Sequence, residues 1–449
     1  MSRWLVALTL VGVLGCDHAE PTASAAPSAA PPVTSVAKQT PLPDASRPDV
    51  GATRNHPLNV VLILIDSMRW DMPWNGYPRP IAPWLTGYEK TVVSYTRAYS
   101  ISCTTARSVA PLMVGKYPSE MPRNGYFFTQ YMPENLFLGE RLRAAGRRAL
   151  GVAAHAYFFP ASGLAQGFDE LFVLPGTVMN NPDEKNVTGE RLTEAAKRIL
   201  SRKVNVDQSD GKRFFAYLHY MDPHAPYVAY EDQPLWGHQP RDRYDQEIHY
   251  TDAQVAAFVR WAKRQPWGPD TAFIVSADHG ESFGEHGHLK HGYEVWEELV
   301  RVPLFIDVPG GQARRIDVPR SHIDLAPTIL ELMGVAAKPP LRGTSLVPEV
   351  FGADPEPRPV IVDLTRDNLE NRRRALIEGT DKLIATGDDE KWLLFDVVAD
   401  PREKKDLTAD RPRFKRMRER YFEVSKTIPL VEVRGDEPPL KDAPEGRRW

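Results

Sequence analysis

The sequence predicts an α/β fold, in which a layered domain with a mostly parallel central sheet is followed by a smaller C-terminal subdomain with a short antiparallel sheet. Three uninterrupted apolar runs, at 59–65, 213–218 and 271–276, have the composition of strands that are buried on both faces. Helical stretches separate these runs, and this alternation is typical of a parallel sheet covered by helices. After about residue 352, short strand-like segments with polar turns indicate the antiparallel subdomain.

The predicted elements divide between the two parts of the body. In the layered domain, at 57–352, helices are expected at 135–145, 188–201, 250–264 and 323–333, and a short helix at 109–115. In the subdomain, at 353–433, strands are expected at 359–364, 374–378, 382–386 and 392–396, followed by a basic amphipathic helix near 411–426. The tail at 434–449 is charged and rich in proline, so we expect it to be disordered.

The N-terminal segment has the pattern of an export signal. Residues 1–16 combine a charged start, an apolar run that is too short to span a bilayer, and a small residue before Cys16. Residues 13–16 (VLGC) resemble a bacterial lipoprotein box, which implies lipidation of Cys16 and a lipid anchor in a membrane; an ordinary signal peptide is the alternative. Residues 17–56 are rich in Ala, Pro and Ser and predict an extended tether. We therefore expect an exported lipoprotein of the bacterial cell envelope, on its periplasmic side or outer surface.

The charge and cysteine content exclude some classes of protein. The 449 residues include 56 Lys and Arg against 59 Asp and Glu, a formal net charge of −3. A dedicated nucleic-acid binder usually carries a basic excess, so we expect no nucleic-acid partner. With 2 Cys, one of them in the export signal, no internal disulfide is expected.

Histidines cluster beside acidic residues in two short segments that follow predicted strands. Six of the twelve histidines lie there: His219, His224, His279, His286, His288 and His291. Asp66 and Asp278 closely follow two predicted strands, and His279 follows Asp278. Ligands of open α/β sheets bind at the carboxyl ends of the strands, so these three residues are candidate ligands of one divalent metal ion. Mixed oxygen and imidazole ligands suit Ca, Mn or Zn.

A hydroxyl-rich run at 100–108 precedes the predicted helix at 109–115 and contains Cys103, Thr105 and Arg107. A nucleophile at a helix N-terminus gains from the free amides there, which favour its ionised oxygen. A cluster of Ser and Thr that only caps the helix is the alternative.

Eight short segments resemble, in this order, the landmarks of the sulfatases, which belong to the alkaline phosphatase-like superfamily. They are 59–66 (NVVLILID), 115–118 (GKYP), 167–169 (GFD), 222–227 (DPHAPY), 277–281 (ADHGE), 301–304 (RVPL), 324–328 (DLAPT) and 394–396 (LFD) with 400–401 (DP). The resemblance covers about residues 58–407 and implies an alkaline phosphatase-like fold and a metal-dependent hydrolase of sulfate esters.

The resemblance also implies roles for individual residues. The implied metal ligands are Asp66, Asp278, His279 and the nucleophile. The residues implied to contact the ester group are His219, His224 and either Lys290 or His291. In this hypothesis Arg107 and Lys290 neutralise the developing charge. His219 or His224 would protonate the leaving oxygen.

The nucleophile position departs from the family's pattern. Sulfatases carry a Cys, or less often a Ser, in a Cys-x-Pro-x-Arg motif and oxidise it to formylglycine. Cys103 and Arg107 keep the first and last residues of this motif, but Thr105 stands at the third. Counting back ten residues from the matching glycine, Gly115, also reaches Thr105, and threonine is the nucleophile of phosphoryl-transferring relatives. We favour Thr105 and keep Cys103 as the alternative.

Two further departures affect the metal and the substrate. Ser67 follows Asp66 where sulfatases usually have paired acids, and one carboxylate fewer makes Mn or Zn more competitive with Ca. The family's Lys-Trp-His segment corresponds to 153–155 (AAH), which keeps His155 as a candidate substrate contact; a core histidine is the alternative.

The leading expectation is hydrolysis of sulfate esters through a covalent intermediate on one of the two candidate nucleophiles. The alternative within the superfamily is a phosphodiester or phosphonate ester hydrolase, or a phosphoryl-group transferase, with a Thr nucleophile. A non-catalytic lipoprotein that binds sulfated or phosphorylated glycans is a third hypothesis, against which the retained metal ligands argue.

Overall fold

The structure is a computed structural model, and it describes residues 56–176, 187–369, 371–431 and 433. The expected signal peptide, its Cys16, most of the tether and the 434–449 tail lie outside the described residues. No helix in the described part of the chain is both long enough and apolar enough to cross a membrane.

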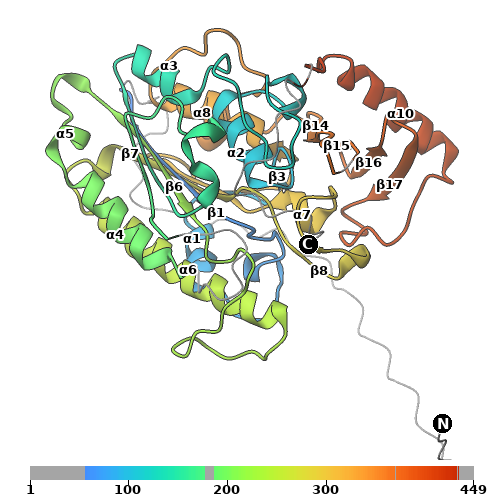
Figure 1. The fold of residues 1–449 in the computed structure, drawn as a ribbon, viewed down its shortest axis with the longest axis horizontal. Helices are drawn as coiled ribbons and strands as arrows, with labels where there is room; N and C mark the ends of the chain where they lie inside the picture. The colour runs from blue at the N-terminus through green and yellow to red at the C-terminus, as the bar shows by residue number, and fades with distance from the viewer. Residues whose placement is uncertain (1–55, 177–186, 370, 432, 434–449) are drawn as a thin grey trace, which may run out of the picture. The chain divides into compact units, whose positions relative to one another are not determined.

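An eight-stranded sheet forms the centre of the fold, in the order β12-β2-β11-β7-β1-β6-β4-β5 (Figure 1). Its central strand β1 (Asn59–Ile65) pairs in parallel with β6 (Phe214–Tyr220) on one side and with β7 (Thr271–Ala277) on the other. The last residue of β1, Ile65, lies opposite the last residues of β6 and β7, Tyr220 and Ala277. These three strands therefore end at one level, and the residues that follow them meet at one edge.

The outer strands complete this sheet. β4 (Arg148–Ala153) and β5 (Glu170–Val173) continue it in parallel beyond β6. β11 (Leu304–Asp307) is antiparallel to β7, β2 (Val93–Tyr95) is antiparallel to β11, and β12 (Arg314–Ile316) is parallel to β2. Small sheets flank it: β10 (Arg301–Val302), β3 (Ala98–Tyr99) and β13 (Arg320–Ser321) form one, and β8 (Ser282–Phe283) and β9 (Leu289–Lys290) another.

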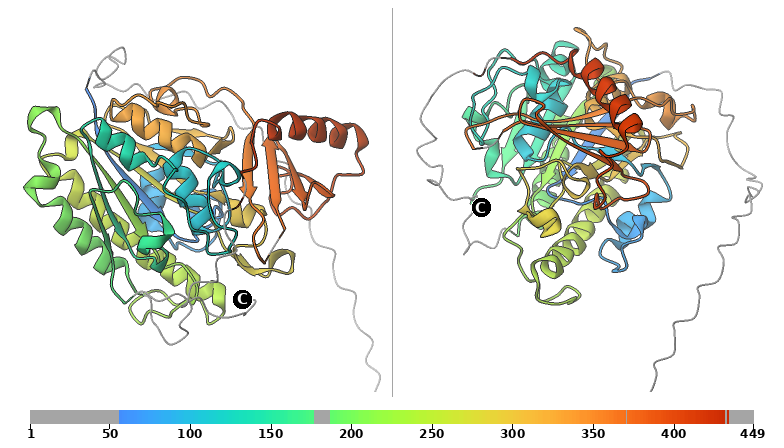
Figure 2. Two further views of the ribbon diagram at one scale, coloured as in Figure 1. Left: turned by 45° about the horizontal axis from the view of Figure 1, so that its top comes forward. Right: turned by 90° about the vertical axis from the view of Figure 1, so that its right-hand side faces the viewer.

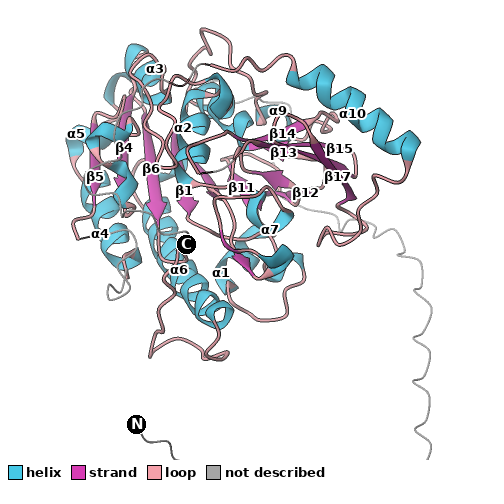
Figure 3. Cartoon of the chain, turned by 45° about the vertical axis from the view of Figure 1, so that its right-hand side comes forward, coloured by secondary structure: helices cyan, strands magenta, loops and turns pink. Residues whose placement is uncertain are grey.

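Helices cover both faces of the sheet because its central strands are apolar on both sides. Val60, Leu62 and Leu64 of β1 belong to one hydrophobic cluster, and Val61, Ile63 and Ile65 to a second, as the alternation of a strand requires. The first cluster includes residues of α2 (Thr105–Val114), α3 (Leu138–Ala144) and α8 (Leu325–Leu332). The second includes residues of α1 (Pro83–Glu89), α4 (Gly189–Leu200) and α6 (Pro240–Lys263), and Figure 3 shows the resulting layers.

The C-terminal sheet consists of four antiparallel strands in sequence order, β14 (Val360–Leu364), β15 (Arg373–Glu378), β16 (Asp381–Thr386) and β17 (Lys391–Asp396). The long helix α10 (Arg411–Ser425) packs on one face through Met417 and Tyr421 (Figure 2). The other face shares a hydrophobic cluster with Tyr99, Cys103 and α7 (Glu297–Val300) of the layered domain. Among the described residues, two short α-helices complete the set, α5 (Lys203–Val206) and α9 (Val347–Val350).

The structure confirms the predicted α/β fold with its small antiparallel C-terminal sheet. Two helices begin earlier than predicted. α6 begins at Pro240 rather than at residue 250. The sequence did not indicate its first turns, because they contain polar residues such as Asp245 and Glu247, which are typical of a loop but are buried here. α2 begins at Thr105 rather than at residue 109, which places the Thr105 side chain in the first turn of a helix.

Candidate active site

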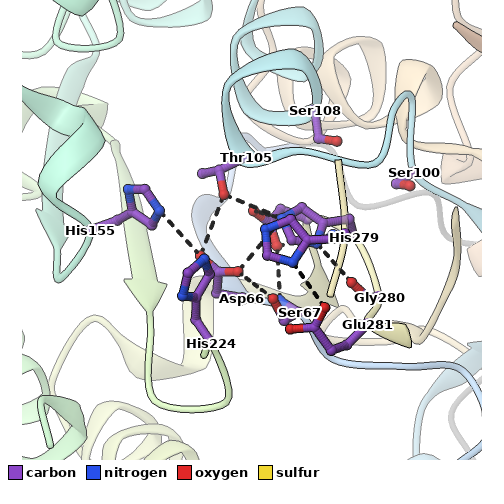
Figure 4. Close-up of polar contacts among 12 residues, drawn as sticks. Asp66, Ser67, Ser100, Thr105, Ser108, His155, His224, His279, Gly280 and Glu281 are labelled. Atoms are coloured by element: carbon purple, nitrogen blue, oxygen red, sulfur yellow. Dashed lines mark hydrogen bonds and ion pairs between the residues drawn. The ribbon is translucent and has the colours of Figure 1, made fainter. Parts of the chain in front are cut away.

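The residues that follow the three central strands converge on one buried site. Asp66 comes directly after β1, Asp278 directly after β7, and His219 is the penultimate residue of β6. Asp66, Asp278 and His279 are all fully buried. Figure 4 shows Asp66 at the centre, with His279 and Thr105 directed towards it.

Asp66, Asp278 and His279 form a cluster with the geometry of a metal site. Each offers one ligand atom, and these atoms lie within 4.8 Å of one another. His279 Nδ1 donates to the Gly280 carbonyl oxygen (2.9 Å), which leaves the lone pair of Nε2 facing Asp66 Oδ1 (3.6 Å) and Asp278 Oδ2 (3.5 Å). Asp278 Oδ2 is buried and has no hydrogen-bond partner. These residues fit a divalent cation, which would satisfy that oxygen.

The charges of the cluster act strongly on one another. Burial opposes ionisation of Asp66, but the neighbouring imidazoles, with His224 and His219 the largest contributors, hold its pKa well below the usual value. Burial likewise opposes protonation of His279, yet the carboxylates of Asp278 and Asp66 raise its pKa. The carboxylates of Asp66 and Asp278 therefore favour a positive charge between them and the His279 ring.

Thr105 is the candidate nucleophile that the structure brings into the site. Its Oγ1 lies 3.4 Å from Asp66 Oδ2 and 3.3 Å from His279 Nε2. Thr105 is the first residue of α2, where the backbone N–H groups have no partner within the helix. The hydroxyl therefore lies beside the candidate metal ligands and at the positive end of a ten-residue helix.

Cys103 occupies a different environment. It is fully buried in the hydrophobic cluster that includes Tyr99, Leu299 and residues of the C-terminal sheet. Burial raises the pKa of its thiol to about 12. A thiol in such surroundings stays protonated and unreactive.

Four further histidines lie around Asp66 and His279, and each has at least one ring nitrogen in a polar contact. His219 Nε2 is 3.2 Å from Asp66 Oδ2, and its Nδ1 is 2.6 Å from the Tyr217 hydroxyl. His155 lies in the loop after β4 with Nε2 3.7 Å from Asp66 Oδ2, and burial keeps its pKa well below the usual value. His155 is thus buried, as a core histidine would be, and it also lies beside Asp66, where a substrate contact would be.

His224 and His291 form the other side of this ring of histidines. The ring centroids of His224 and His291 are 5.0 Å apart, and that of His291 is 4.1 Å from that of His279. His224 Nδ1 donates to its neighbour's carbonyl oxygen (2.6 Å), and His291 Nδ1 contacts Glu281 Oε1 (3.1 Å). In both rings Nε2 is the nitrogen available to a ligand.

The contacts of Arg107 and Asp222 lie outside this group of histidines and carboxylates. The Arg107 guanidinium is buried and paired with Asp367 Oδ2 (2.5 Å). Lys290 lies half-buried in β9. Asp222 accepts hydrogen bonds from the backbone of Thr188 and Gly189 at the start of α4, so its role is structural.

Sequence reasoning missed the residues that orient the site. Tyr217 holds His219, and Tyr227 donates to Glu281 Oε2 (2.8 Å), the acid that holds His291. The sequence could have indicated Tyr217, because it lies two residues before His219 on the same strand, and residues two apart on a strand share a face. Ser67, the residue after Asp66, donates its hydroxyl hydrogen to Asp66 Oδ1 (2.9 Å).

Gly280 allows the loop that follows β7, which carries Asp278 and His279, to approach α7 closely. A Cβ at this position would lie 2.0 Å from the Glu298 carbonyl oxygen. The Gly280 N–H donates to the Leu299 carbonyl (2.8 Å), and the Glu281 N–H donates to the Glu298 carbonyl (3.1 Å). This pairing places Glu281 next to His291.

Comparison with known proteins agrees with this arrangement. The family model of the sulfatases matches residues 58–335, more than half of the chain. The chain belongs to the sulfatase family. A model described as the C-terminal region of N-sulphoglucosamine sulphohydrolase matches residues 284–424 of this sulfatase-family chain. The resemblance inferred from the eight segments is therefore confirmed.

Relatives of this sulfatase-family enzyme include the ulvan-active sulfatase of Formosa agariphila, which is 25% identical over 348 residues, 66% of each chain. Alignments with the first curated relatives cover 20% to 66% of those proteins' lengths. A solved putative sulfatase of Bacteroides thetaiotaomicron has a TM-score of 0.70 at 18% identity, over 83% of this chain and 92% of that one. A solved phosphonate monoester hydrolase of Agrobacterium radiobacter has a TM-score of 0.67 at 18% identity, over 83% and 95%. These structures share the fold.

Proposed function

We propose that this sulfatase-family enzyme hydrolyses an anionic ester in a metal-dependent reaction that proceeds through a covalent intermediate on Thr105. The position of the Thr105 hydroxyl, within 3.4 Å of Asp66 Oδ2 and 3.3 Å of His279 Nε2, carries this proposal. The burial of Cys103 in a hydrophobic cluster favours Thr105 over formylglycine as the nucleophile.

The cation would be held by Asp66, Asp278, His279 and the hydroxyl of Thr105. When bound, a divalent ion supplies positive charge that favours the ionised hydroxyl and neutralises the ester oxygens. Ser67 stands in place of a second acid, so the site offers few hard anionic ligands, and this supports Mn or Zn over Ca.

The residues of the chain account for the proton transfers. Thr105 Oγ1 attacks the sulfur or phosphorus and forms a new O–S or O–P bond as the bond to the leaving oxygen breaks. The hydroxyl donates a hydrogen bond to Asp66 Oδ2, and because a bound cation would favour the ionised hydroxyl, its proton would leave to water before the attack. His224 is fixed through Nδ1, so a proton on its Nε2 can pass to the leaving oxygen, with His219 as the alternative donor. Water or an acceptor alcohol then takes the group from Thr105.

Sulfate esters are the first candidate substrates, because the relatives are described as sulfatases. Phosphodiesters, phosphonate esters or phosphoryl transfer form the second candidate, which Thr105 itself favours. A threonine cannot form the hydrated aldehyde through which formylglycine releases sulfate, whereas a phosphorylated threonine can be resolved by a second in-line attack. Lys290 and His291 are proposed to contact the substrate, together with His155.

The cellular location is part of the same proposal. The lipoprotein-like sequence at 13–16 supports an exported enzyme anchored through Cys16 in the bacterial cell envelope. In the producing bacterium, a Cys16→Ala variant should lose incorporation of labelled fatty acid; unchanged labelling would contradict the anchor.

The test of function compares aryl sulfate, aryl phosphodiester and aryl phosphonate monoester substrates with the purified protein, supplied in turn with Ca²⁺, Mn²⁺ or Zn²⁺. Turnover of any of them that depends on the metal and on Thr105 supports the proposed reaction. Sulfate release selects the first candidate, and phosphoryl turnover without sulfate release selects the second. Equal rates with wild type and Thr105→Ala would refute the proposal.

A further inference from the structure

A second cluster of metal-ligating side chains lies outside the active site. It consists of His286 in the turn between β8 and β9, Glu298 in α7, and Glu403 in the segment after β17. One ligand atom from each residue lies within 4.8 Å of the others. The second cluster shares no residue with Asp66, Asp278 and His279, so it is a separate candidate site.

Glu298 contributes a buried oxygen that lacks a partner. Its side chain is 2% exposed, and Oε1 makes no hydrogen bond. The ring nitrogen Nε2 of His286 lies 3.9 Å from this oxygen, which is beyond hydrogen-bond distance. A carboxylate oxygen removed from water without a partner is costly, so this atom indicates a positive group in the second cluster.

The other two residues are held in place. The His286 ring stacks on Trp296, with ring centroids 3.9 Å apart and planes 9° apart. Glu403 is fully buried, and its Oε2 accepts a hydrogen bond from the Glu297 N–H (2.6 Å). His286 also has a φ of 52°, a left-handed conformation that costs free energy in a residue other than glycine. Such strain is found where a side chain must point in a required direction.

Glu298 is the acid of this region that lacks a close basic partner among the described residues. Lys382 Nζ contacts both Glu403 (2.9 Å) and Glu297 (3.1 Å), and Arg301 Nη1 lies 3.7 Å from Glu297, whereas no described Lys or Arg nitrogen lies within 4 Å of the Glu298 carboxylate. A cavity of about 510 Å³ is lined by His286 and Glu403, by the acids Asp71 and Glu285, and by the cationic side chains of Arg69, Arg241, Arg402 and Lys404. It adjoins two of the three residues of the second cluster.

We propose that His286, Glu298 and Glu403 bind a second divalent metal ion. One imidazole and two carboxylates, with water from the cavity completing the coordination, suit Zn²⁺. The ion would join the β8–β9 turn, α7 and the segment after β17. Because the Glu298 carbonyl accepts the Glu281 N–H, and Glu281 holds His291, this ion stabilises the loop that carries an active-site histidine.

The test measures bound Zn²⁺ in the full chain after removal of loosely held metal, using elemental analysis. The Asp278→Asn variant removes a ligand of the first site, and we expect it to retain about one equivalent of Zn²⁺. Adding His286→Gln or Glu298→Gln should weaken the remaining Zn²⁺ binding more than about tenfold. Adding His288→Gln, a change of a histidine outside the second cluster, should leave that binding unchanged.

Co²⁺ provides an independent measurement. Asp278→Asn protein should show visible absorption bands on addition of Co²⁺, and these should be lost in Asp278→Asn/His286→Gln protein. His286 is part-exposed, so its variant should fold, as circular dichroism can verify. Absence of Zn²⁺ from Asp278→Asn protein would overturn this inference and leave the proposed function intact. Conversely, the wild type could bind one equivalent of Zn²⁺ that is lost in the Glu298→Gln variant and kept in the Asp278→Asn variant. That result would support the second site and contradict the metal ion of the proposed function.

Discussion

Replacing the two candidate nucleophiles separately tests the assignment of Thr105. The Thr105→Ala variant removes the only oxygen of that side chain, the atom that lies within 3.4 Å of Asp66 Oδ2 and 3.3 Å of His279 Nε2. Loss of a nucleophile typically lowers kcat by about 10⁴-fold or more, or about 5.5 kcal/mol of transition-state stabilisation. Thr105→Ser keeps the oxygen and should retain much of the activity.

Cys103→Ala should behave in the opposite way. The thiol is buried among apolar side chains of the C-terminal sheet and α7, so its removal leaves a small cavity and costs about 1–2 kcal/mol of stability. It removes no contact with Asp66 or His279, and kcat should stay within about twofold of wild type.

The assay is kcat/KM for whichever aryl ester the wild type turns over, with thermal unfolding measured on each variant to separate folding from chemistry. Mass spectrometry of the peptide containing residue 103 should find an unmodified cysteine. An aldehyde at residue 103, or a loss of activity in Cys103→Ala as large as that in Thr105→Ala, would refute the reasoning.

Three further changes probe the surroundings of the site. Burial lowers the pKa of His322 to about 3, so the stability this neutral ring contributes is lost as the pH falls from about 6.5 towards 3. His322→Gln should therefore reduce the fall in unfolding free energy between pH 7 and pH 4 by up to about 3 kcal/mol, measured by urea titration at both pH values; an unchanged difference would contradict this. Asp367→Asn leaves the buried Arg107 guanidinium without its counter-charge and should cost about 1–3 kcal/mol in the same titration, whereas an unchanged midpoint would show that the pair is dispensable. Gly280→Ala should lower kcat/KM at least about tenfold because its Cβ would meet a carbonyl oxygen of α7, while Gly87→Ala, which meets nothing within 4 Å, should be neutral; equal activities would argue against the close approach.

The central strands and the residues after them were predictable because their signals are local. The apolar run 59–65 is β1 itself, and Asp66 and Asp278 follow strands whose ends the pairing places at one level. Spacing to Gly115 favoured Thr105, and the structure places that hydroxyl beside Asp66. Periodicity and position along the chain were sufficient for these features.

Features that depend on distant partners could not be predicted in this way. Arg107 and Asp367 are 260 positions apart, so no local pattern showed that this arginine pairs with the C-terminal region. The hydrophobic surroundings of Cys103 are likewise formed by residues around 295–299 and 360–395. A motif can place a side chain near a site in the sequence, but only the packing of the chain determines which way it points.

The cluster around Cys103 affects how such enzymes can be recombined. The C-terminal sheet contributes Val362, Ala375 and Phe395 to a core that also contains Tyr99 and Cys103, a few residues before Thr105. The Asp363 N–H, on β14, donates to the Ile101 carbonyl oxygen (2.8 Å). Exchanging the C-terminal sheet between family members would therefore require matched changes in the segment that leads to Thr105. The C-terminal sheet and the segment that leads to Thr105 should therefore change together during evolution rather than independently.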